Sequence, residues 1–230
     1  ADYIITPSLF LQNYFRSKDF KIEYIPNGID FSNFSFKRDA VKPHSLLWVR
    51  AFSPIYSPEI AIHTLIKLKK EFPDATLTMV GPDKGEKIKV ERLIENYKLS
   101  ASVNIVGAIP NNMLFEYYQT HSVFLNTTQY ESFGVCIAEA ASCGIPIISN
   151  KIGEVPFLWK NGENSFLVQD NSPKQFAEYA STIFKDQKLS EAISISARNN
   201  VVQFDLQIIL DKWKTFFSKA TKQNISIKAT

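Results

Sequence analysis

Two glutamates eight residues apart are the best candidates for chemistry in this chain. They lie in the segment YESFGVCIAEAASCGIP, residues 130–146, where Glu139 interrupts an otherwise apolar run. A carboxylate is rarely buried alone, because removing its charge from water costs several kcal/mol. Glu139 therefore either faces water or contacts a partner that requires a carboxylate. The plain alternative is a solvated Glu131 together with a Glu139 that pairs with a surface lysine.

The elements around these glutamates place both at one edge of a sheet. The apolar run 122–128 predicts a strand, 129–133 is the loop that carries Glu131, and 134–144 predicts a helix that ends at a glycine. Ligands of open parallel sheets bind outside the carboxyl ends of the strands. The loop should therefore border a ligand site.

The start of this helix is predicted to be an anion site. Phe133, Gly134 and Val135 present N–H groups without intrahelical partners at the positive end of the helix dipole. Glu139 follows roughly 7 Å further along the axis, within reach of a ribose attached to a diphosphate. Its two oxygens can accept from two vicinal hydroxyls. Glu131 would face the other end of such a ligand, where a sugar would lie.

A regular alternation of strand and helix patterns predicts an α/β fold with a Rossmann-like, doubly wound parallel sheet. Apolar runs predict strands at 45–49, 75–81, 103–107, 122–128, 145–149 and 165–168. Three- and four-residue spacing predicts helices at 58–72, 87–99, 111–121 and 134–144, with two or three more after residue 173. Before this alternation, strands are expected at 3–6 and 22–30, with a helix at 7–15.

Three regions follow from this pattern. Residues 44–203 form the predicted domain, and residues 1–43 read as the tail of a preceding domain plus a linker. The chain begins in strand-like sequence without a methionine, so we expect a piece of a longer protein. Residues 204–230 predict a last helix with Trp213 and two phenylalanines on its surface. We weigh equally that it packs on the preceding domain and that it packs on this one.

Composition indicates an ordinary globular protein. The 230 residues are 45% hydrophobic, and a net charge of +3 is too small to argue for nucleic acid or an anionic membrane. Cys136 and Cys143 are about 10 Å apart along a helix, too far for a disulfide, which favours the cytoplasm. The three histidines have no partners at metal-ligand spacing, so no metal site is expected.

The segment ESFGVCIAEAASCGIP resembles the E-x7-E motif of retaining GT-B glycosyltransferases, family four in particular. The family wording is E-G-F-G-x-x-x-x-E-A-x-A-x-G-x-P, and in this chain Ser132 stands in place of the first glycine. Other segments resemble the family in the same order: ADYIITPS, IPNGID, FPDATLTMVGPD, VNIVGAIPNNMLFEYYQTHSVFLNTT and KIGEVPFLWKNGENSFLVQ. The resemblance implies the C-terminal half of a GT-B fold, which holds a nucleotide-sugar donor.

The resemblance also implies site residues. Glu131 would lie beside the donor sugar as the catalytic residue, Glu139 would bind the ribose, and Arg50 would serve the diphosphate. The implied donor-binding set is Arg50, Ile109, Ser132, Phe133, Gly134, Val135 and Glu139, with Ile109 bordering the base. No cofactor or metal is implied.

The implied activity is transfer of a sugar, with retention, from a nucleotide-diphosphate sugar to a glycan or lipid-linked acceptor in bacterial polysaccharide biosynthesis. The expected partners are donor, acceptor and the protein's own N-terminal domain, with no nucleic acid. Localisation is expected to be cytoplasmic, and association of the full-length protein with the inner face of a membrane is left open. This chain alone is expected to be inactive.

One departure keeps alternatives open. The family has a second cation a few residues after the arginine, where this chain has Tyr56 and Ser57, and Val49 replaces the preceding glycine. Either another group supplies the charge or donor binding is weak. A non-catalytic binding module is therefore the main alternative. An epimerase is disfavoured by the E-x7-E wording, and a phosphorylase by the lack of a persuasive pyridoxal-phosphate lysine.

Overall fold

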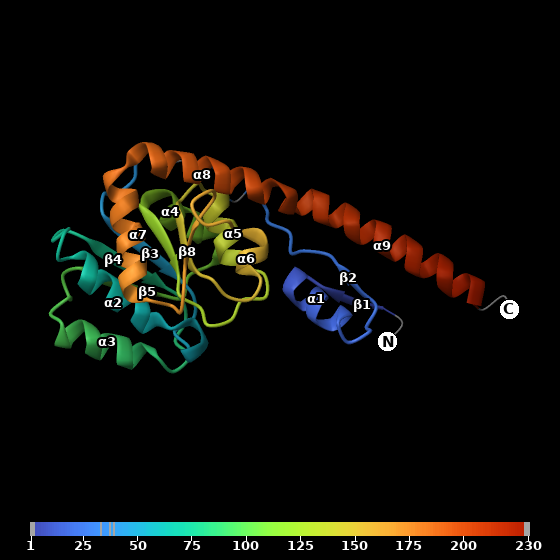
Figure 1. Ribbon diagram of the computed structural model, residues 1–230, viewed down its shortest axis with the longest axis horizontal. Coiled ribbons are helices and arrows are strands. Elements are labelled where there is room, and N and C mark those ends of the chain that lie inside the picture. Colours follow the sequence, from blue (N-terminus) through green and yellow to red (C-terminus); the bar gives the residue numbers. More distant parts are fainter. Residues whose placement is uncertain (1–2, 33, 37, 39, 228–230) are drawn as a thin grey trace.

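A six-stranded, all-parallel sheet forms the centre of the larger of two units in the computed structural model (Figure 1). The strand order is β5-β4-β3-β6-β7-β8, which confirms the predicted Rossmann-like α/β fold. The strands are β3 (Ser45–Val49), β4 (Thr76–Val80), β5 (Val103–Gly107), β6 (Val123–Asn126), β7 (Ile147–Asn150) and β8 (Phe166–Val168). The structure describes residues 3–32, 34–36, 38 and 40–227, and the side chains only as far as residue 221.

Helices cover both faces of this sheet and bury two apolar layers. One layer packs the strands against α2 (Pro58–Leu68), α3 (Lys87–Asn96) and α7 (Pro173–Lys185). The other packs them against α4 (Leu114–Thr120), α5 (Val135–Ser142) and much of α8 (Gln187–Val201). The central strands β3 and β6 are buried along their whole length, which explains why their sequences are continuously apolar rather than alternating.

The chain order reverses between β3 and β6. From β3 it proceeds outward through β4 and β5, and from β6 it proceeds the other way through β7 and β8. Connections that leave two neighbouring strands in opposite directions open a crevice at their carboxyl ends. The residues that follow β3 and β6 therefore border the natural ligand site of this fold.

Some predicted boundaries differ from the observed ones. The predicted strand 22–30 is limited to β2 (Ile22–Tyr24), because Pro26 has no N–H to donate to a ladder and a turn follows it. The predicted helix 111–121 begins as a single 3-10 turn, Asn111–Met113, before α4. Between α5 and β8 the short α6 (Val155–Leu158) was not predicted.

The smaller unit consists of β1 (Ile4–Thr6), α1 (Leu9–Arg16) and β2, covered by the long α9 (Leu206–Ile227). Ile209 and Phe216 of α9 are buried against Ile25, and the Phe216 ring lies 5.3 Å from the Tyr3 ring. The last helix thus packs on the first residues of the chain. Figure 1 shows it extending away from the large sheet, across β1 and β2.

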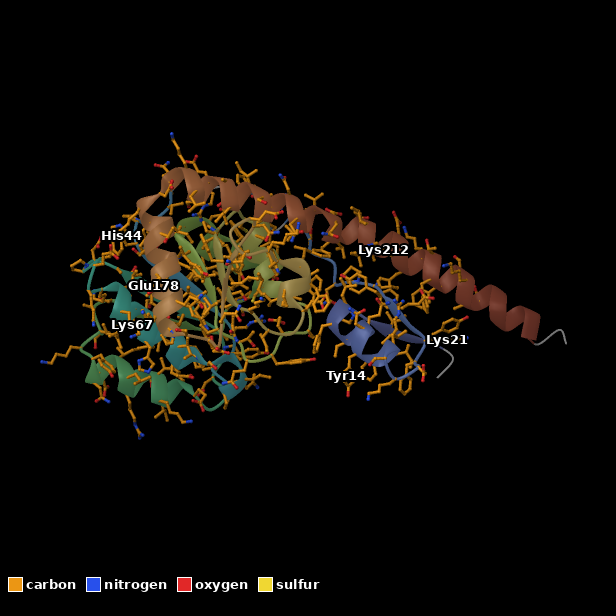
Figure 2. The ribbon with its side chains drawn as sticks, in the orientation of Figure 1. Tyr14, Lys21, His44, Lys67, Glu178 and Lys212 are labelled. Carbon is orange, nitrogen blue, oxygen red and sulfur yellow. The ribbon has the colours of Figure 1, made fainter. Side chains whose placement is uncertain are left out.

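The two segments that connect the units, near Ile29 and near Leu206, lie side by side. The Ile29 N–H donates to the Phe204 carbonyl at 2.8 Å, and the Leu206 N–H donates to the Ile29 carbonyl at 3.0 Å. In Figure 2, His44, which precedes β3, lies at the end of the larger unit away from Tyr14 and Lys21 of the smaller one. The smaller unit therefore faces the carboxyl ends of the strands. No helix in the described part of the chain is long and apolar enough to cross a membrane.

We expect Phe216→Ala to lower the free energy of unfolding by about 3–5 kcal/mol, the cost of removing a large buried aromatic side chain. The matched control is Phe217→Ala, because the Phe217 side chain is 57% exposed and its loss should cost less than about 0.5 kcal/mol. Denaturant unfolding of both variants measures the difference. Equal losses would contradict the packing of α9 on β1 and β2.

Candidate active site

An ion pair between Arg50 and Glu131 connects the segments that follow the two central strands, β3 and β6. Arg50 follows β3, Glu131 lies in the loop after β6, and a guanidinium Nη2 donates to a carboxylate oxygen. The two side chains are 15% and 9% exposed. The Arg50 Nε is buried and has no hydrogen-bond partner among the described residues. Arg50 therefore keeps one buried donor unpaired next to the ion pair.

Tyr56 provides the second contact of the Arg50 guanidinium. The guanidinium carbon lies 5.1 Å from the centre of the Tyr56 ring, within cation–π range. From the sequence, Tyr56 was predicted only to stand where the family has a cation. The structure shows that it holds the one arginine of the site instead of adding a second charge.

The start of α5 is open to a ligand. Gly134, its N-cap, has φ 86° and ψ 55°, the left-handed conformation that glycine adopts most easily. No side chain caps this helix, and the Phe133, Gly134 and Val135 N–H groups donate to no other described residue. The Phe133 ring is buried 5.2 Å from the Phe204 ring, so the loop that presents these groups is anchored.

Glu139 is buried, with 5% of its surface exposed, and its partners are neutral. The Asn111 amide donates to Oε1 at 3.0 Å, and the Tyr118 hydroxyl donates to Oε2 at 3.2 Å. Burial raises the pKa of the Glu139 carboxyl above its usual value of 4.5, although both hydrogen bonds and Arg50 oppose the shift. Glu139 thus does not face water, and its role toward a ligand stays a prediction. None of its described hydrogen-bond partners is a surface lysine.

One cleft of about 330 Å³ brings together several of the predicted residues at the carboxyl ends of the strands. Its lining includes Arg50, Tyr56, Ile109, Asn111, Val135 and Glu139. Glu131 lies behind Arg50, while Ser132, Phe133 and Gly134 contribute the main chain that leads into α5. Among the described lining residues Arg50 is the only cation. The ligand-binding roles of all these residues stay predictions.

Other residues that shape the site were not predicted. Asn111 and Tyr118 fix Glu139, and the position of Asn111 after β5, at the ligand edge, was the available signal. Gly153 packs against the Glu131 main chain, because a Cβ at Gly153 would lie 2.2 Å from the Glu131 carbonyl oxygen. The Glu154 N–H also donates to that oxygen at 2.9 Å. Neither of these two contacts has a sequence signature by itself.

The donors and acceptors of the cleft suit phosphate and hydroxyl groups. Main-chain N–H groups and a guanidinium favour phosphate oxygens, whereas a buried carboxylate favours hydroxyls. In the described part of the chain, no three histidine, cysteine or acidic side chains are grouped as metal ligands. The arrangement is therefore that of a site for a phosphorylated, hydroxyl-bearing ligand.

Comparison with known proteins identifies the family. The model of the glycosyl transferases group 1 family matches residues 30–200. The chain belongs to this family. The match spans the whole six-stranded sheet together with Arg50, Glu131 and Glu139.

Individual relatives agree with this assignment. The chain is 27% identical over 177 residues to the D-inositol 3-phosphate glycosyltransferase of Streptomyces bingchenggensis, covering 72% of this chain and 38% of that protein. Its fold matches Anabaena Alr3699/HepE, solved with UDP and glucose, with a TM-score of 0.84 and 22% identity, over 95% of this chain and 63% of that one. It also matches the pneumococcal O-GlcNAc transferase GtfA, solved with UDP and GlcNAc, with a TM-score of 0.82 and 24% identity, over 95% and 45%.

The chain covers only part of the length of the relatives that it matches. It spans between 31% and 44% of four curated relatives that it matches. The solved structures are likewise matched over only part of their chains, as expected for the C-terminal domain of a GT-B fold. The predicted family and fold are confirmed.

We expect Gly153→Ala to disturb the site through the Glu131 main chain. Gly162→Ala is the matched control, because both glycines have positive φ, 54° and 76°, but nothing lies within 4 Å of a Cβ at Gly162. Left-handed strain should cost each variant about 1–2 kcal/mol. Displacement of Glu131 should cost Gly153→Ala about 1–3 kcal/mol more in the free energy of unfolding. Equal losses in denaturant unfolding would show that the close approach is unimportant.

We also expect the raised pKa of Glu139 to appear in the pH dependence of stability. The folded state holds this proton more tightly, so the contribution of Glu139 to stability falls as pH rises from 4.5 through the raised pKa. Glu139→Gln removes that component, so wild type minus variant isolates it. Unfolding free energies of both proteins, measured from pH 4.5 to neutrality, provide the test. A flat difference would mean that the pKa is not raised.

Proposed function

We propose that this glycosyltransferase-family chain is the donor-binding half of a retaining enzyme and binds a nucleotide-diphosphate sugar in the cleft between β3 and β6. The carrying observation is that Arg50, the only cation among the described residues lining the cleft, and the uncapped start of α5 lie on either side of the point where the chain order reverses. Both features attract phosphate, and both lie where this fold binds ligands. The diphosphate would lie between them.

The remaining groups would contact the parts of the donor on either side of the diphosphate. Glu139 lies further along α5 and lines the same cleft, so it would accept hydrogen bonds from the ribose hydroxyls. Ile109 lines the cleft after β5 and would border the base. Glu131 would lie beside the sugar, where Arg50 holds its carboxylate. Ser132 lies in the main chain between Glu131 and the amides at the start of α5.

The nature of the donor is proposed from relatives. Two related folds were solved with UDP and a sugar, which makes UDP the first probe for this cleft. The acceptor is proposed to be a glycan or lipid-linked molecule bound largely by a preceding N-terminal domain. Residues 1–43 and the helix 204–230 would belong to or cover that domain. The proposed setting is bacterial polysaccharide assembly at the cytoplasmic side.

A second candidate is a nucleotide-sugar-binding module without turnover. One observation favours it: Arg50, the only cation among the described cleft residues, is already paired with Glu131. A bound diphosphate would therefore be only partly neutralised. Such a module would bind nucleotide but transfer no sugar, even in its full-length form.

We expect Glu139→Gln to weaken UDP binding by about 1–3 kcal/mol, the range for a hydrogen bond to a charged group. The variant should also discriminate less between UDP and 2′-deoxy-UDP, because the ribose contact is the one altered. Isothermal calorimetry measures both values. Glu163→Gln, an exposed glutamate paired with Lys160, is the control and should bind as wild type does. Unchanged affinity in a folded Glu139→Gln would make Glu139 a structural acid.

We expect this chain alone to bind UDP without transferring sugar. Positioning donor against acceptor supplies a large share of the rate, and the acceptor is proposed to bind elsewhere. Transfer from UDP-glucose and UDP-GlcNAc should therefore be measured for this chain and for the longer protein. Robust transfer by the 230 residues alone would refute the division of labour between two halves.

A further inference from the structure

Glu154 joins the larger unit to the smaller one through its side chain. It is fully buried just after β7, and its carboxylate accepts three hydrogen bonds from the start of α1. The Ser8 hydroxyl donates at 2.7 Å, the Leu9 N–H at 2.9 Å and the Phe10 N–H at 2.7 Å. The carboxylate thus binds the first-turn donors that α1 leaves unpaired, at the positive end of its dipole.

The same residue holds the active-site loop through its main chain. The Glu154 N–H donates to the Glu131 carbonyl at 2.9 Å, next to the close approach of Gly153. The Glu131 carboxylate in turn binds Arg50. A continuous series of contacts therefore runs from α1 through Glu154 and Glu131 to the Arg50 guanidinium.

This connection is separate from the place where the chain crosses between the units. The crossing is held by Ile29 and Leu206, whereas the Glu154 contact lies where α6 meets α1. In Figure 1, α6 and α1 face each other below the start of α9. The Phe157 and Phe10 rings lie 6.3 Å apart at this contact. Burial and the Glu154 carboxylate raise the pKa of the nearby Tyr24 to about 12, so this phenol stays neutral there.

We propose that Glu154 is a positioning residue that couples the seating of α1 to the placement of Glu131 and Arg50. The proposal rests on the proposed function of the cleft, because it assigns Arg50 and Glu131 to the donor. When α1 is seated on the carboxylate, the 153–154 main chain holds the Glu131 carbonyl in place. When α1 leaves, the Glu154 carboxylate loses its three donors, so the 153–154 main chain is no longer fixed from the side of α1 and the Glu131 carbonyl bound to it can shift.

A simple helix-capping role predicts a different result. A cap would stabilise α1 and leave the donor cleft unchanged, whereas coupling transmits a change in the smaller unit to Arg50. Ser8 is the best place to make that change, because it is buried in the smaller unit and does not line the cleft. Ser8→Ala removes one donor to Glu154 and also the N-cap of α1.

The test measures UDP affinity by calorimetry and the Arg50 Nε–H signal by NMR in ¹⁵N-labelled protein. Glu154→Gln should weaken UDP binding about tenfold, the loss of one charge-assisted hydrogen bond. Ser8→Ala should weaken it between about three- and tenfold. Both variants should shift the Arg50 Nε–H signal, and the double variant should resemble Glu154→Gln alone. Glu163→Gln should stay within about twofold of wild type.

An unmoved Arg50 signal and unchanged UDP affinity in Ser8→Ala would overturn the coupling, and they would do so even if Glu154→Gln failed to fold. A different result would contradict the proposed function. If wild type does not bind UDP, the cleft is not the expected nucleotide site. The Arg50 signal then still decides whether α1 and the cleft are coupled.

Discussion

The buried ion pair between Arg50 and Glu131 is the interaction on which the site depends. It joins the ends of β3 and β6, the two strands at which the chain order reverses. Removing one member of such a pair leaves an uncompensated buried charge, which typically costs about 3–5 kcal/mol. Tyr56, Asn126 and the Gly153–Glu154 main chain surround the pair and limit its movement. The pair is therefore held in place by contacts within the fold.

The two carboxylates of the E-x7-E motif differ in their surroundings. Glu131 has a cationic partner, whereas Glu139 has two neutral donors in a buried position. Neutral hydrogen bonds compensate less of the desolvation of a charge than an ion pair does, so the pKa of Glu139 is raised. A ligand hydroxyl that donates to Glu139 would recover part of that cost. Glu131 thus holds Arg50 in place, whereas Glu139 would gain a further hydrogen bond from a hydroxyl-bearing ligand.

The smaller unit is built from the first and last elements of the chain. Its first helix is bonded to Glu154, and its strands are covered by the last helix, so elements from both ends of the chain pack together in this unit. The fully buried Glu154 serves both units, because its side chain binds the start of α1 and its main-chain N–H binds the Glu131 carbonyl.

The sequence by itself determined the parallel sheet, the order of its helices and the loop–helix segment that carries Glu131 and Glu139. Continuous apolar runs and period-3.6 patterns are local, and the E-x7-E segment is contiguous, so both can be read along the chain. Only the tertiary structure decided which groups bind these carboxylates. Arg50 and Glu131 are 81 residues apart, and Ser8 and Glu154 are 146 apart. From the sequence, Tyr56 only marked the absence of a cation. Such contacts depend on side-chain directions that arise when strands and helices pack, and no local pattern encodes them.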